Sequence, residues 1–70
     1  MDMRYVAMHL ALKHRQAESQ LRLELMRNME EQRRLKGAIR SYNRSAQALQ
    51  RKYRFNLNEM ARECSKYPIN

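Results

Sequence analysis

The sequence predicts an all-α fold, in which two helices form an antiparallel hairpin that self-associates. Three observations favour this class. Leu, Met, Ala, Gln, Glu, Arg and Lys, which all favour helices, dominate the 70 residues, and there is one glycine and one proline. Apolar side chains recur every three or four residues, as they do along one face of a helix. A polar stretch, Glu30–Arg34, lies near the middle of the chain and divides it into two arms of similar length.

The first helix is expected at about residues 3–30, because Asp2 is a suitable N-cap and helix-forming residues follow it. The turn is expected at about residues 28–38. Asn28 begins a variant of the capping-box sequence there, and Gly37 suits the position just past a helix C-terminus.

The second helix is expected at about residues 38–66, because Pro68 disfavours helical backbone at Tyr67. Residues 67–70 then form a short C-terminal tail. The whole chain is short enough to be a single small helical domain, and a core of this size favours self-association or a partner.

The second half of the chain has one apolar seam with heptad spacing, which is typical of coiled coils. Its members are Leu35, Ile39, Tyr42, Ala46, Leu49 and Tyr53, and Leu57, Met60, Cys64 and Tyr67 continue it after one extra step of four residues. Phe55 lies off this seam and is a candidate for an exposed contact.

The first half has two apolar stripes on different faces. The first stripe comprises Met3, Val6, Leu10, His14, Ala17, Leu21 and Leu25. The second comprises Tyr5, Met8, Leu12, Leu23 and Met26. A helix that is apolar on two faces usually packs against two neighbours. We therefore expect the second stripe to be a protein interface, buried in a homodimer or against another protein.

Two other all-α arrangements stay open. The seam runs through residues 28–38 without a change of phase, and a glycine in a helix costs only about 1 kcal/mol, so one long helix in a coiled-coil oligomer is an alternative. A three-helix arrangement would need a further break, near Ser41–Ser45 or at Asn56. The segment Tyr53–Asn58 alternates as a strand would, but the chain offers no second strand to pair with it.

The most informative feature is the distribution of charge. Fifteen Lys and Arg against seven Asp and Glu give a net charge of +8, yet no acidic residue occurs between Gln32 and Asn58. On a helix, six basic residues of this segment fall within about 80°, opposite the seam. We call them the basic stripe: Arg33, Lys36, Arg40, Arg44, Arg51 and Arg54. Like charges at this spacing destabilise a helix, which favours a polyanionic partner.

The predicted function is therefore non-enzymatic binding of nucleic acid, DNA or RNA, through phosphates and with low sequence specificity. The basic stripe would make the contacts. The alternative is a helical adaptor, chaperone or inhibitor that binds a protein partner through the two-faced first helix, with the stripe against an acidic surface. A merely solvated basic face is the third interpretation. The spacing matches neither a helix-turn-helix nor a basic leucine zipper.

Several classes of function are disfavoured. A chain this small and narrow does not readily enclose a pocket for a small-molecule substrate, so an enzyme is not expected. Cys64 is the only cysteine, which excludes an intramolecular disulfide and favours the cytoplasm. His9 and His14 are five residues apart, a poor spacing for metal ligands on a helix, and neither metal nor other cofactor is expected. No apolar run suits a membrane span or a signal peptide.

Overall fold

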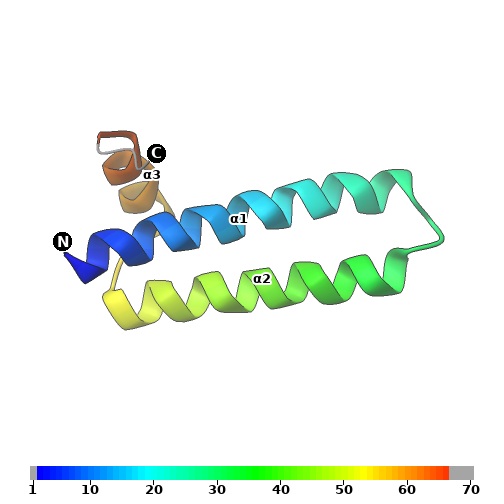
Figure 1. Ribbon diagram of the computed structural model, residues 1–70, viewed down its shortest axis with the longest axis horizontal. Coiled ribbons are helices and arrows are strands. Elements are labelled where there is room, and N and C mark those ends of the chain that lie inside the picture. Colours follow the sequence, from blue (N-terminus) through cyan, green and yellow to red (C-terminus); the bar gives the residue numbers. More distant parts are fainter. Residues whose placement is uncertain (1, 67–70) are drawn as a thin grey trace.

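The structure is a computed structural model that describes residues 2–66. It contains three helices, α1 (Met3–Arg27), α2 (Gln32–Tyr53) and α3 (Leu57–Lys66). Figure 1 shows α1 and α2 side by side and antiparallel, with α3 across the first half of α1. The molecule measures 42 × 22 × 19 Å. The all-α class is confirmed for the described residues, but the fold is not a two-helix hairpin, because a third helix is present.

The first turn is tighter than predicted. The Asp2 side chain accepts a hydrogen bond from the Arg4 backbone N–H at 3.0 Å and caps α1 as expected. Asn28 follows the last residue of α1, and its Oδ1 accepts from the Glu30 N–H at 3.1 Å. The turn therefore occupies residues 28–31, and Gly37 lies inside α2 and not at a helix end.

The predicted second helix, residues 38–66, is interrupted after Tyr53. Arg54 adopts a left-handed conformation with φ 53°, and the Phe55 N–H donates to the Gln50 carbonyl at 3.1 Å. This is the Schellman arrangement, in which backbone N–H groups satisfy the last carbonyls of a helix and stop it. The expected tail, residues 67–70, lies outside the described residues.

The next helix begins with its own cap, and one arginine holds the junction. Asn56 Oδ1 accepts from the Glu59 N–H at 2.7 Å, which starts α3. From α1, Arg4 Nε donates to the Tyr53 carbonyl at 2.9 Å, and Arg4 Nη2 donates to the Arg54 carbonyl at 3.0 Å and pairs with Glu59. A cation at the C-terminus of α2 also interacts favourably with the helix dipole. Arg4 therefore links all three helices.

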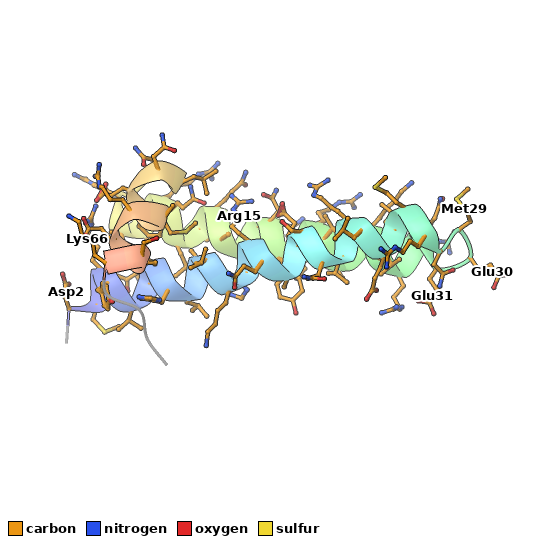
Figure 2. All side chains as sticks on the ribbon, turned by 90° about the horizontal axis from the view of Figure 1, so that it is seen from above. Asp2, Arg15, Met29, Glu30, Glu31 and Lys66 are labelled. Carbon is orange, nitrogen blue, oxygen red and sulfur yellow. The ribbon has the colours of Figure 1, made fainter. Side chains whose placement is uncertain are left out.

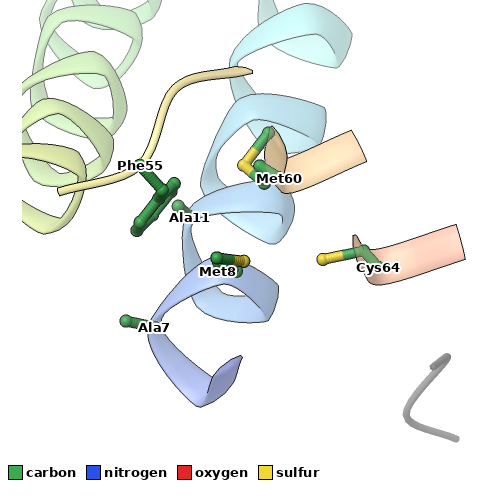
Figure 3. Packing of buried hydrophobic residues seen from close by; sticks show 6 residues of the cluster. All are labelled: Ala7, Met8, Ala11, Phe55, Met60 and Cys64. Atoms are coloured by element: carbon green, nitrogen blue, oxygen red, sulfur yellow. The ribbon is translucent and has the colours of Figure 1, made fainter. Parts of the chain in front are cut away.

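The main core cluster lies where the three helices meet. Its members are Ala7, Met8, Ala11, Phe55, Met60 and Cys64, with Leu12, Leu49 and Tyr53 partly buried against it. Figure 3 shows the side chains of Met8 and Cys64 pointing toward one another between α1 and α3. Small alanine side chains on α1 let the neighbouring helices approach closely, and the larger side chains fill the space around them. Phe55, predicted as an exposed candidate, is buried in this cluster.

The predicted stripes of α1 need correction. Met8 of the second stripe is 2 % exposed, because α3 covers it, whereas Met3 and Leu10 of the first stripe are 63 % and 45 % exposed. The buried line of α1 runs through Ala7 and Ala11, between the two stripes. The expectation of two neighbours for this helix is met within the chain by α2 and α3. Self-association stays a prediction.

A polar cluster joins α1 to α2 near the middle of the hairpin. Arg15 Nη1 donates to Asn43 Oδ1 at 2.6 Å and to Glu18 Oε2 at 3.1 Å, and Arg15 Nη2 donates to Gln50 Oε1 at 3.0 Å. Arg22 pairs with the same glutamate at 3.6 Å. Because Arg15, Asn43 and Gln50 are partly buried, sliding one helix past the other would break the two hydrogen bonds that cross between the helices, so these bonds favour one helix register.

Burial raises the pKa of the Cys64 thiol above its ordinary value, and the neighbouring Glu63 carboxylate raises it further. Folding therefore favours the protonated thiol. That contribution to stability is complete below the ordinary thiol pKa and is lost as the pH rises through the folded value. We expect a thiol reagent at pH 8 to modify the native protein more than about tenfold more slowly than the urea-unfolded chain. Equal rates in the two states would contradict the docking of α3.

Candidate nucleic-acid interface

The outer face of α2 carries basic side chains and no acidic ones. This helix holds seven of the fifteen Lys and Arg residues and no Asp or Glu. Its buried side chains, Leu35, Ile39 and Ala46, face α1. The opposite face presents the exposed members of the basic stripe that α2 contains, which are Arg33, Lys36, Arg40, Arg44 and Arg51. At 1.5 Å per residue, these five side chains extend over about 27 Å.

Arg54, the sixth residue predicted for the stripe, does not continue the helix. It lies in the link between α2 and α3 in a left-handed conformation, and its carbonyl accepts from Arg4. Its side chain is exposed. The structure therefore keeps five stripe residues on one continuous helix and places the sixth at its end, where the backbone changes direction.

The stripe has no acidic partner within residues 2–66. The ion pairs of this part of the chain are Arg4–Glu59, Arg15–Glu18, Arg22–Glu18, Arg34–Glu31 and Arg62–Glu63. The hydrogen bond and the charge of Glu31 raise the pKa of Arg34, so this arginine of the first turn of α2 already has an acidic partner. Figure 2 places Glu30 and Glu31 at the turn end of the hairpin. The stripe cations are therefore left unneutralised along the whole helix.

The position of α3 leaves the stripe open. The third helix packs against α1, where Met60 and Cys64 join the core cluster, and the outer face of α2 carries no other element in the described structure. A rigid surface results, because the hairpin holds α2 from its inner face while its outer face is free. Cations on a rigid scaffold lose less conformational freedom on binding than cations on a disordered tail.

One part of the stripe is hollowed. An open hollow of about 460 Å³ is lined by Gln32, Arg33, Lys36, Gly37 and Arg40. One of its lining residues is Gly37, where a Cβ atom would have no heavy atom within 4 Å apart from its own helix. Three cationic side chains therefore surround a place where a ligand can approach the helix backbone.

The structure separates the five residues predicted as a protein interface. Met8 is in the core, and Leu12 is partly buried against it. Tyr5 is half-buried and its ring lies edge-on to that of His9, with 4.6 Å between the ring centres. Leu23 and Met26 are 51 % and 80 % exposed, near the turn end of α1. These residues do not form one continuous surface, since α3 covers part of it.

Sequence reasoning from helix spacing accounts for the partners of Glu18, because Arg15 and Arg22 lie three and four residues away on the same helix. It missed the junction formed by Arg4. The Arg4–Glu59 pair spans 55 positions, and nothing in the local sequence identifies it. The signal that could have found the junction is Asn56 followed by Glu59, a capping-box pattern that starts a third helix.

Comparison of the chain with models of protein families, with curated proteins and with solved structures gives no match. Within the described part of the chain, no three His, Cys, Asp or Glu side chains come together as metal ligands would. None of the helices between residues 3 and 66 is long and apolar enough to cross a membrane.

Proposed function

We propose that the protein is a non-enzymatic nucleic-acid-binding protein that contacts phosphates through the basic stripe, with low sequence specificity. The observation that carries this proposal is the exposed, unpaired row of five cations on the outer face of α2. Arg dominates that row, and its planar guanidinium suits phosphate oxygens. Phosphate contacts orient a protein on a duplex but carry no sequence information.

The energetics of α2 support a polyanionic partner. Lys36, Arg40 and Arg44 follow one another at intervals of four residues, so neighbouring side chains repel each other. Each such pair destabilises the helix by a few tenths of a kcal/mol in the free protein. A phosphate backbone removes this repulsion and releases condensed counterions, which is the main source of affinity in non-specific nucleic-acid binding.

The first test is fluorescence anisotropy with labelled duplex DNA, duplex RNA and single strands between about 50 and 300 mM salt. Three to five phosphate contacts on duplex DNA, depending on how many stripe cations share a phosphate, predict a slope of log affinity against log salt of about −3 to −5. The double variant Arg40→Gln, Arg44→Gln removes two cation–phosphate contacts. We expect it to reduce the slope by about 0.9–1.8 and to weaken binding at 150 mM salt by about 5- to 30-fold.

The matched control is Lys13→Gln, Arg27→Gln, which lowers the net charge by the same amount at exposed positions of α1. We expect its slope to stay within about 0.5 of the wild-type value. Circular dichroism should show unchanged helicity for both double variants. Equal flattening by both variants would mean attraction by net charge alone, and absence of wild-type binding at 150 mM salt would overturn the proposal.

A protein partner is the second candidate function, and one observation favours it. Leu23, Met26 and Met29 are 51 %, 80 % and 73 % exposed near the turn end of the hairpin, on an apolar surface that no other element covers in the described structure. Such a surface suits an adaptor, a chaperone or a homodimer contact. Leu23→Arg should then abolish partner binding or dimerisation in sedimentation measurements, whereas the phosphate-binding proposal predicts no change in the salt slope.

A further inference from the structure

We infer that Gly37 marks the seat of one phosphate group, where a nucleic-acid phosphodiester lies against the α2 backbone among Arg33, Lys36 and Arg40. This inference rests on the proposed function and deepens it, because it identifies one place in the stripe as a specific contact. The juxtaposition that carries it is the hollow of about 460 Å³ that these residues line together with Gln32.

The fold itself gives no reason for a glycine at this position. Gly37 lies inside α2, five residues from its start. Its φ is not positive, so its backbone conformation is one that other residues also adopt. A Cβ atom there would meet nothing within 4 Å, so no neighbouring element needs the space either. Alanine would be the better helix former. Glycine is therefore needed here neither for the turn nor for the core. Close approach of a ligand to the helix backbone would explain it.

The side chains around Gly37 suit a phosphate anion. Positions three and four residues apart are adjacent on a helix surface, so Arg33 and Arg40 flank Gly37 on either side along the axis. The adjacent Lys36 completes the cationic wall, and the side chains of all three cations line the hollow. All of these side chains are free of acidic partners in the described structure. A Cβ at position 37 would push a bound phosphate outward and lengthen its contacts with these cations.

The test uses the full chain with the variant Gly37→Ala, in the same anisotropy experiment with labelled duplex DNA. We expect the melting temperature to rise by about 4–8 °C, because alanine favours the helix. We expect affinity at 150 mM salt to fall about fivefold and the slope to decrease by about 0.9, which corresponds to the loss of one phosphate contact. A variant that is more stable and yet binds more weakly cannot owe its weaker binding to unfolding.

The matched control is Ser45→Ala, an exposed position of α2 outside the stripe. It also favours the helix but leaves the hollow unchanged, so it should bind as the wild type does. Undiminished affinity of Gly37→Ala, with the wild type binding, would overturn the phosphate seat and leave the proposed function standing. Equal weakening by both alanine variants would also overturn it. No wild-type binding at 150 mM salt would overturn both proposals.

Discussion

Replacing Met8 by aspartate should undock α3 and unfold most of the protein. Met8 is 2 % exposed and packs in the cluster with Met60 and Cys64. The variant loses the packing of a large side chain, worth about 2–5 kcal/mol, and buries a carboxylate. If the introduced carboxylate captured Arg4 one turn away, Arg4 would be drawn from its contacts with the end of α2. Loss of this packing with a buried carboxylate, or displacement of Arg4, removes most of the free energy of unfolding, which is about 4–10 kcal/mol for a chain of this length.

Met26→Asp is the matched control, because Met26 lies in the same predicted stripe of α1 but is 80 % exposed. Its free energy of unfolding should stay within about 1 kcal/mol of the wild-type value. Thermal melts by circular dichroism measure both variants, and the reactivity of Cys64 toward a thiol reagent reports α3 separately. Similar melting curves for the two variants would show that α3 does not cover Met8. A large loss of stability in Met26→Asp at high protein concentration alone would reveal a dimer.

Leu35→Ala should produce the second largest loss of stability. Leu35 is fully buried on the inner face of α2, in the half of the hairpin that α3 does not reach. Removing three carbon atoms there leaves a cavity between two helices, and such truncations cost about 2–5 kcal/mol. Each kcal/mol corresponds to about 4–8 °C in the melting temperature of a domain of this size.

The matched control for this truncation is Leu23→Ala, since Leu23 is 51 % exposed on α1. We expect it to change the free energy of unfolding by less than about 1 kcal/mol. Urea unfolding followed by circular dichroism gives both values on one scale. Amide hydrogen exchange should also show that Leu35→Ala opens the turn end of the hairpin first, because Arg4 and the core cluster hold the other end. An equal loss of amide protection at both ends of the hairpin would argue against a less stable turn end.

Local patterns of the sequence determined much of the fold. The three- and four-residue periodicity predicted helices, and Asp2 was found to cap α1 as expected. The seam of α2 was found buried at Leu35, Ile39 and Ala46, so the basic stripe lies on the opposite, solvent-exposed face. These features depend on neighbours within about one helical turn, which a sequence displays directly. The absence of acidic residues from α2 removes partners within the helix, whereas the packing of α3 against α1 leaves the outer face of α2 open.

Only the tertiary structure decided the break at residues 54–56 and the buried face of α1. The seam continues across the break with one extra step of four residues, which is compatible with a long helix, and the capping of α3 by Asn56 competes with that continuation. Burial of Phe55 and the contacts of Arg4 favour the break, and both join positions about fifty residues apart. On α1, the sequence predicted two apolar faces, and its pattern did not show which line of residues would be buried. The small side chains of Ala7 and Ala11, which add little to a hydrophobic pattern, determine where three helices can meet.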